Sequence, residues 1–338
     1  MRRFFDPRQR AHAPARELHN GGWTDHAETP ARAEDIRRAL GETEAPTDQG
    51  LGPIEAVHDR AYLDFLRHAH ADWRAAGREG DAVPYVFPVR RRRALPLERI
   101  DGRLGRYAYD AVTPIAESTW DAAYWSAQAA LAATTAVLGG ERAAFALCRP
   151  PGHHAGTDYL GGYCYLNNAA IAAEAALRSG AGRVAVLDID YHHGNGTQDI
   201  FYARGDVGFV SIHADPATDY PYFWGRADET GEGAGQGATR NIPLPRGTAE
   251  EAYRVALDEA LATIAGWGAR FLILSFGADT FEGDPICAFR LASDSYGRIG
   301  ARIAAAGLPT VIVMEGGYAV EALGTNVARF LHGFGMKE

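Results

Sequence analysis

The sequence predicts an α/β protein in which one parallel sheet is covered by helices on both faces. From residue 120 onward, apolar runs of strand length alternate with alanine-rich runs of helical length. The apolar runs are nearly continuous, which is typical of strands that are buried on both faces of a parallel sheet. The 338 residues contain no internal repeat and no linker rich in Ser or Pro, so we expect a single domain over 1–338.

The N-terminal third is expected to be mixed in structure. Thr29-Pro30 predicts the capped start of a helix over 31–40, and apolar residues at helical spacing predict a second helix over 62–76. Three prolines predict a loop insertion over about 82–110. Within this insertion, the four consecutive arginines at 90–93 are expected in a solvated loop or at a subunit contact.

The remaining two thirds contain the alternating pattern. The predicted strands span 143–148, 183–188, 207–213, 271–276 and 309–314. The predicted helices span 120–138, 168–179, 249–267, 293–306 and 320–334. Asn168 is an expected N-cap, and Gly180 and Gly307 are expected to end the helices before them.

Composition excludes several classes of protein. The net charge of −9 excludes a global nucleic-acid footprint. A mean hydropathy of −0.24, with no apolar run of about 18 residues, gives no membrane span, and the first residues lack the apolar core of a signal peptide. Three cysteines are too few for a disulfide framework, so a cytoplasmic protein is expected.

Titratable and polar residues follow four of the predicted strands. In an open α/β sheet, ligands bind beyond the carboxyl ends of the strands. The segments 149–154, 188–196, 277–279 and 315–318 all begin at such ends. We therefore expect their side chains to form one site.

Asp190, His192 and Asp279 are the candidate metal ligands in these segments. Asp190 and His192 are two residues apart, which places both side chains on one face of an extended chain. One imidazole nitrogen and two carboxylate oxygens suit Zn²⁺ or Fe²⁺ and leave a position open for water or substrate. An Asp-x-His pair taken by itself can also cap a turn.

Two further features indicate catalysis. His153 and His154 follow a rigid Pro-Pro-Gly turn, and imidazoles beside a metal suit general acid–base chemistry. Asp188 and Asn195 can orient the two rings. Tyr318 follows two glycines and can donate its hydroxyl to a developing oxyanion. Taken separately, the histidines could be a buried hydrogen-bonded pair and the tyrosine a packing residue.

These segments resemble the zinc-dependent deacetylase branch of the arginase/deacetylase superfamily. The motifs that carry the resemblance are RPPGHH at 149–154, DxDxHHGxG at 188–196 and EGGY at 315–318. Shorter matches lie near the start of the chain, at 30–34 and 57–63. Within the branch, the segments 87–91 and 194–206 are most similar to the bacterial acetylpolyamine amidohydrolases, which are class II-like relatives of histone deacetylases.

The resemblance implies a central sheet of eight parallel strands and a zinc ion bound by Asp190, His192 and Asp279, with Fe²⁺ or Co²⁺ also fitting these ligands. It implies that His154 acts as general base and then as general acid toward the leaving amine. His153, paired with Asp188, assists electrostatically, and Tyr318 polarises the substrate carbonyl. Asn195 stands where many histone deacetylases have Asp, so His154 lacks a carboxylate partner.

The resemblance also implies structural K⁺. The first expected K⁺ site uses side chains or carbonyls of Asp188, Asp190, His192, Ser211 and Ile212. A second monovalent site is expected near Phe201, Arg204 and Val207.

A narrow tunnel is expected to lead to the metal. The resemblance places Tyr163 and Tyr220 on its flanks, Gly162 in its wall, and Glu17 and Asp101 at its mouth. The insertion at 82–110 is expected at the interface of a homodimer, where it narrows the entrance and excludes protein substrates. Val112 occupies a position that is acidic in a close relative, which favours a shorter diamine or another acylated amine.

The expected activity is therefore hydrolysis of acetyl or short acyl groups from small amines such as N-acetylputrescine and N-acetylcadaverine. The main alternative is a deacetylase of protein acetyl-lysine. A dinuclear manganese ureohydrolase is disfavoured because the segment after His192 lacks further carboxylate ligands. A non-catalytic binding protein is disfavoured because it has no need of His153, His154 and Tyr318.

Overall fold

The computed structural model describes residues 1–89 and 95–336. Its described residues form one α/β domain around a sheet of seven parallel strands, in the order β1-β4-β9-β8-β5-β6-β7. The strands are β1 (Arg2–Phe4), β4 (Ala143–Ala146), β5 (Val184–Asp188), β6 (Val207–Ala214), β7 (Thr239–Leu244), β8 (Phe271–Phe276) and β9 (Thr310–Met314). The predicted fold class is confirmed, and the expected number of eight strands is corrected to seven.

The five strands predicted from apolar runs are the five inner strands of this sheet. The two strands that the sequence did not reveal, β1 and β7, are its edges. β1 has three residues, two of them arginines. β7 contains Arg240 and Pro243, and half of its residues are only partly buried. An edge strand needs apolar residues on fewer sides and tolerates proline, so neither segment has the continuous apolar pattern of a buried strand.

A two-stranded antiparallel ribbon, β2 (Arg16–His19) and β3 (Gly22–Asp25), stands apart from the main sheet. Its turn is Asn20-Gly21, and both residues have positive φ, 50° and 78°. Asn-Gly is the residue pair most typical of a two-residue hairpin, because both turn positions require positive φ. This signal was present in the sequence, although the ribbon was not predicted.

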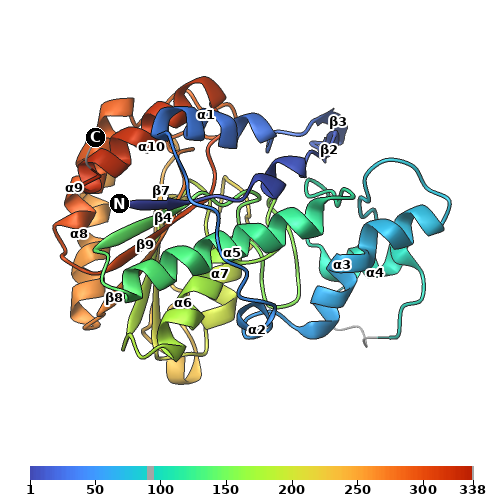
Figure 1. The fold of residues 1–338 in the computed structure, drawn as a ribbon, viewed down its shortest axis with the longest axis horizontal. Coiled ribbons are helices and arrows are strands. Elements are labelled where there is room, and N and C mark those ends of the chain that lie inside the picture. The colour runs from blue at the N-terminus through green and yellow to red at the C-terminus, as the bar shows by residue number, and fades with distance from the viewer. Residues whose placement is uncertain (90–94, 337–338) are drawn as a thin grey trace.

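Helices cover both faces of the sheet (Figure 1). They are α1 (Pro30–Leu40), α2 (Gly52–Glu55), α3 (Arg60–Ala75), α4 (Ile100–Tyr107), α5 (Thr119–Leu138), α6 (Asn168–Arg178), α7 (Asn195–Phe201), α8 (Glu250–Gly266), α9 (Ser293–Ala304) and α10 (Val320–Phe334). Two short 3-10 helices are η1 (Pro7–Ala11) and η2 (Gly233–Gly235). The N-cap of α6 is Asn167 rather than Asn168, because the Asn167 side chain accepts a hydrogen bond from the Ala170 amide at 2.9 Å.

Two apolar cores lie on opposite faces of the sheet. Along β5, Val184 and Val186 pack into the core formed with α3, α5 and α6. Ala185 and Leu187 point the other way and pack with α1, α8, α9 and α10. This alternation shows why the inner strands are apolar at every position.

The insertion at 82–110 is not a continuous loop, because its last part forms α4. This helix begins only after the last of the three prolines, which is why the proline pattern concealed it. Arg103 of α4 donates a hydrogen bond to Asp72 of α3 at 2.6 Å. A Cβ on Gly105 would lie 1.7 Å from the carbonyl oxygen of Val86, so glycine allows the preceding segment to cross the helix. The arginines at 90–93 lie outside the described residues.

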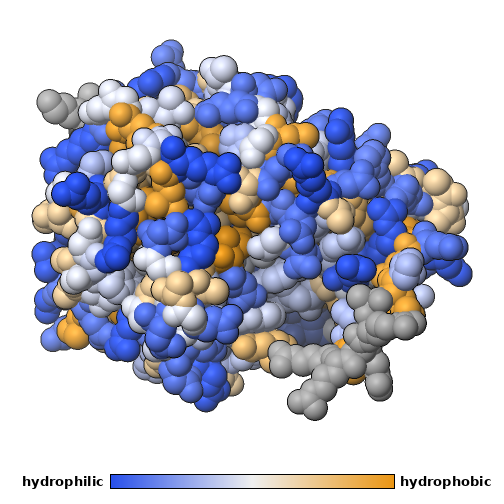
Figure 2. Space-filling view, turned by 90° about the horizontal axis from the view of Figure 1, so that it is seen from below, coloured by the Kyte–Doolittle hydropathy of each residue, from blue (hydrophilic) through white to orange (hydrophobic). Residues whose placement is uncertain are grey.

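The surface is mainly polar on the face shown in Figure 2, where hydrophobic residues appear in small areas between hydrophilic ones. Among the described helices, none combines the length and the apolar character that a membrane span requires.

Candidate active site

The four strand-end segments meet as the sequence predicted. The Ala278 amide donates to the Gly316 carbonyl at 2.9 Å, and the Gly316 amide donates to the Asp190 carboxylate at 2.8 Å. Beside them lies a cavity of about 430 Å³. Its wall includes residues from the strand-end segments and from the expected tunnel, namely His154, Gly162, Tyr163, His192, Tyr220 and Tyr318.

The candidate metal ligands converge at the inner end of this cavity. Nδ1 of His192 lies 3.2 Å from Oδ1 of Asp190 and 3.2 Å from Oδ2 of Asp279. Ligands about 2 Å from one zinc ion have a mutual spacing of this order. Asp190 and Asp279 are fully buried, and Oδ2 of Asp279 has no hydrogen-bond partner among the described residues.

Electrostatics also fit a cation at this position. Burial and the negative charge of Asp190 raise the pKa of Asp279 to about 7. Two buried carboxylates this close are costly unless a positive charge lies between them. The residues present therefore fit a divalent cation held by Asp190, His192 and Asp279.

The surrounding backbone must come unusually close to these ligands. A Cβ on Gly277 would lie 2.1 Å from a carboxylate oxygen of Asp190, and one on Gly316 would lie 2.6 Å from the same oxygen. Cys287, which was not predicted as a site residue, offers its sulfur within 4.8 Å of ligand atoms of His192 and Asp279.

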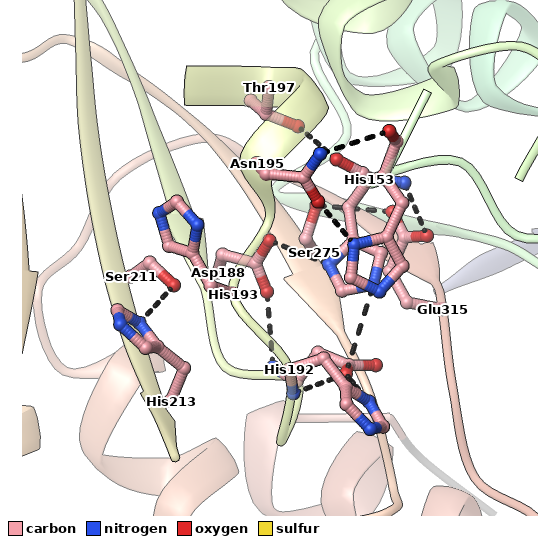
Figure 3. A network of polar contacts seen from close by, with 12 residues as sticks. His153, Asp188, His192, His193, Asn195, Thr197, Ser211, His213, Ser275 and Glu315 are labelled. Atoms are coloured by element: carbon pink, nitrogen blue, oxygen red, sulfur yellow. Dashed lines mark hydrogen bonds and ion pairs between the residues drawn. The ribbon is translucent and has the colours of Figure 1, made fainter. Parts of the chain in front are cut away.

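The adjacent histidines have different environments. Nδ1 of His153 lies 3.0 Å from Oδ2 of Asp188, and these two side chains point toward each other in Figure 3. Burial lowers the pKa of His153, but the charges of Asp188 and Asp190 outweigh burial and raise it to about 10. Nδ1 of His154 lies 2.6 Å from Oδ1 of Asn195. Burial and the neighbouring His153 hold the pKa of His154 well below its usual value. One histidine is therefore held as a cation and the other as a neutral base, which is the separation that acid–base catalysis uses.

Glu315 holds the histidine loop in place, a role that the sequence analysis did not assign. Its carboxylate accepts hydrogen bonds from the amides of Gly152 at 2.7 Å and His153 at 3.1 Å, and from the Ser275 hydroxyl at 3.2 Å. Burial raises its pKa to about 7. Glu315 is the first residue of the EGGY motif, so its place in the motif was the available signal.

Tyr318 is fixed from two sides. The guanidinium of Arg32 lies 4.9 Å from the centre of its ring and donates to the carbonyl of Gly317 at 2.6 Å. The carboxylate of Asp284 accepts from the backbone amides of Tyr318 at 2.7 Å and Ala319 at 3.3 Å. Burial raises the pKa of Tyr318 further above its usual value, so its hydroxyl remains protonated and available as a donor.

The expected tunnel residues line the cavity. Gly162 has φ of 56°, and a Cβ there would lie 2.2 Å from the ring of His154, so this position requires glycine. The hydroxyl of Tyr220 donates to Asp110 at 2.7 Å, and Asp110 also accepts from the Gly162 amide at 2.7 Å. Asp110 lies in the cavity wall but was not predicted, because no motif marks it. Val112 lies in the same wall, as expected.

The structure does not bring Glu17 or Asp101 to the cavity wall of their own chain, within the described residues. Glu17 is 2% exposed on β2, where it accepts hydrogen bonds from His26 and from the Tyr163 hydroxyl, both at 2.9 Å. Its placement at an open mouth is corrected to a position behind Tyr163. Asp101 lies on α4, where it forms ion pairs with Arg78 and Arg99.

The residues expected around the first K⁺ lie close together because β5 and β6 are paired, with Asp188 opposite Ser211. The Ser211 hydroxyl contacts Nδ1 of His213 at 2.8 Å, and Ile212 follows on the same strand. At the second expected site, the Arg204 amide donates to the Phe201 carbonyl at 2.9 Å, and Val207 begins β6. Both K⁺ sites remain predictions.

Comparison with known proteins places this arrangement in a family. The family model described as the histone deacetylase domain matches residues 26–334, so the chain belongs to the histone deacetylase domain family. It is a hydrolytic deacetylase.

Similar full-length proteins identify the part of the family concerned. The chain is 52% identical to acetylpolyamine amidohydrolase 1 of Pseudomonas aeruginosa, with 99% of each chain covered. It is 47% identical to the acetylpolyamine amidohydrolase of Mycoplana ramosa, covering 98% of this chain and 99% of that one. The crystal structure of the acetylpolyamine aminohydrolase from Burkholderia pseudomallei superimposes with a TM-score of 0.95 at 45% identity, covering 99% and 98% of the two chains.

Proposed function

We propose that this chain hydrolyses the amide bond of acetylated polyamines and diamines, such as N-acetylputrescine and N-acetylcadaverine, with zinc as its metal. The observation that carries the proposal is the convergence of three metal-ligand side chains, a His154 base and a Tyr318 hydroxyl in one cavity with tyrosine walls. The names of these similar full-length proteins support the choice of substrate.

The protein residues divide the chemistry among themselves. When bound, zinc polarises the substrate carbonyl and lowers the pKa of a bound water. The His154 ring, held neutral, removes a proton from the attacking water and then delivers it to the nitrogen of the leaving amine. His153, held as a cation by Asp188, stabilises the negative charge that develops. The Tyr318 hydroxyl donates a hydrogen bond to the carbonyl oxygen as that oxygen becomes negative.

The cavity walls suit an alkyl amine. Tyr163 and Tyr220 provide ring faces for a methylene chain and for a cation near the mouth. Asp219, in the same wall, is neutralised by an ion pair with Arg246 at 2.5 Å. Asp110 is instead held by neutral donors, among them Tyr220. We therefore assign attraction of the substrate ammonium to Asp110 rather than to Glu17.

We further propose that the chain forms a homodimer in the cytoplasm, and the insertion supports the dimer. Several large apolar side chains of the insertion are exposed, namely Tyr85, Val86, Phe87, Val89, Leu95 and Leu97. Apolar side chains grouped in one exposed segment are typical of a contact surface. A partner placed here would bring the insertion, and Asp101 with it, toward a neighbouring entrance.

The test is a comparison of kcat/KM on zinc-loaded protein, together with the mass of the protein in solution. N-acetylputrescine, N-acetylcadaverine and acetylspermidines are compared with an acetyl-lysine peptide. A dimer that prefers the free acylated amines supports the proposal. Preference for the peptide would assign the chain to protein deacetylation, and activity on neither would reject both substrates while leaving the deacetylase family intact.

A further inference from the structure

The hydrogen-bond partner of the proposed general base His154 is the side-chain amide of Asn195. A carboxylate at this position would stabilise the charged form of His154 directly, whereas an amide does not. Oδ1 of Asn195 lies 2.6 Å from Nδ1 of His154 and 3.4 Å from the Tyr109 hydroxyl. Nδ2 of Asn195 faces the His154 carbonyl at 3.5 Å and the Tyr159 hydroxyl at 3.4 Å. Asn195 is the first residue of helix α7, and Figure 3 shows its side chain between Thr197 and the histidine rings.

These contacts fix the orientation of the Asn195 side-chain amide. An amide oxygen only accepts and an amide nitrogen only donates, so Nδ1 of His154 must carry the hydrogen. If the amide were reversed, its oxygen would face the His154 carbonyl and its nitrogen would face the hydrogen on Nδ1. The orientation of Asn195 therefore decides which ring nitrogen of His154 is free to accept a proton.

A carboxylate fixes the outer end of this arrangement. The Tyr159 hydroxyl donates to Oδ2 of Asp199 at 2.6 Å, which leaves its oxygen to accept from Asn195. The Tyr159 ring packs directly on Gly156, where a Cβ would lie 2.3 Å from it, and edge-on against Tyr109. These two contacts hold the ring in place. Donors thus run in one direction, from His154 through Asn195 and Tyr159 to Asp199.

We propose that Asp199 is a positioning residue that acts through Tyr159 and Asn195 to keep the hydrogen of His154 on Nδ1. This inference rests on the proposed function, in which His154 is the base. With Nδ1 protonated, Nε2 is the nitrogen that takes the proton from water. Without Asp199, the Tyr159 hydroxyl is free to turn and donate toward Asn195, which removes an acceptor from Nδ2.

The position of Asp199 also has a physical reason. A carboxylate at residue 195 would be fully buried next to His154, in a centre that already holds three buried aspartates, and burying another charge there is costly. Asp199 is exposed, so a charge costs less there than at residue 195, although partial burial raises the pKa of Asp199 to about 6. Tyr159 and Asn195 are neutral, so they can fix the direction of the hydrogen bonds to His154 without placing the charge of Asp199 in the centre.

The experiment uses full-length zinc-loaded protein with ¹⁵N-labelled histidine. The ¹⁵N shift of Nε2 in His154, assigned by comparison with His154→Ala, reports whether that nitrogen carries a hydrogen. We compare the wild type with Asp199→Ala and Tyr159→Phe, and with Asp199→Glu as the conservative variant. The matched control is Asp158→Ala, which removes an exposed carboxylate next to Tyr159 in the sequence. The Tyr159 hydroxyl bonds Asp199 and Asn195 rather than Asp158, so this variant leaves the proposed hydrogen bonds in place.

Wild type is expected to show a bare Nε2. Asp199→Ala and Tyr159→Phe should shift the Nε2 signal toward the protonated form and lower kcat about 3- to 10-fold at little-changed KM, the size of one hydrogen bond. The double variant should lose no more than either single variant, Asp199→Glu should restore part of the loss, and Asp158→Ala should match wild type.

Unchanged Nε2 shifts in Asp199→Ala and Tyr159→Phe would overturn the proposal. So would a protonated Nε2 in wild type, or equal changes in Asp158→Ala. The proposed function fails separately: if His154→Ala kept near-normal kcat, His154 would not be the base, whatever its tautomer.

Discussion

The catalytic centre and the substrate entrance of this protein are built in different ways. The centre is formed by segments that leave four inner strands of one sheet, and three of these segments carry a short motif. The entrance is formed by the β2–β3 ribbon, the end of the insertion and the loop around Tyr220. Parallel strands bring their ends together by topology, whereas the entrance depends on how separate loops pack. We therefore expect substitutions in the centre to have large effects, and substitutions at the entrance to alter selectivity.

Removing a metal ligand should have the largest effect on the centre. Asp279→Ala deletes the carboxylate whose Oδ2 has no hydrogen-bond partner among the described residues, and it leaves two of the three proposed protein ligands. We expect metal content and activity to be lost together. Metal analysis of the purified protein and the rate of N-acetylputrescine hydrolysis test this. An active, metal-loaded variant would mean that Asp279 is not a ligand.

His154→Ala should separate catalysis from metal binding. His154 lies 2.6 Å from Asn195 and is not among the three proposed metal ligands, so the variant should keep its zinc. Loss of a general base typically lowers kcat about 10²- to 10⁴-fold. The same two measurements apply, and near-normal kcat in this variant would show that another group removes the proton.

Tyr318→Phe should have an intermediate effect. The ring stays in place because Arg32 and Asp284 hold it, while the donor to the oxyanion is lost. Loss of one such donor costs on the order of 10²–10³ in kcat. The measurement is kcat with KM followed in parallel. A change of less than about tenfold would make Tyr318 a packing residue instead.

At the entrance, Asp110→Asn and Glu17→Gln test which carboxylate attracts the substrate. The readout is the ratio of kcat/KM for N-acetylcadaverine to that for a neutral alkyl acetamide of the same length. Asp110→Asn should lower this ratio about tenfold, the size of a partly buried charge interaction. Glu17→Gln should affect both substrates equally, because Glu17 acts by holding the Tyr163 hydroxyl. A selective loss in Glu17→Gln would restore the role implied by the resemblance.

The same contrast explains which features could be predicted from sequence. Asp190 and His192 could be placed because their spacing and their position after an apolar strand determine where they lie. Glu17 was misplaced because β2 pairs with β3 and turns this side chain behind Tyr163. Tyr159 joins the catalytic histidine to Asp199 through contacts between residues 36 to 41 apart in sequence, which no local pattern reveals.

The smallest expected effect concerns Val112, which lies in the cavity wall. The resemblance implies that a close relative has an acidic residue at this position. Val112→Glu adds a second negative charge close to Asp110. A polycation gains more from this charge than a diamine does, so kcat/KM for acetylspermidine should rise a few-fold relative to that for N-acetylputrescine, and the gain should shrink as salt is added. Val112→Gln is the matched control because it has the same size without the charge. An equal change in both variants would show that shape, rather than charge, limits the substrate at this position.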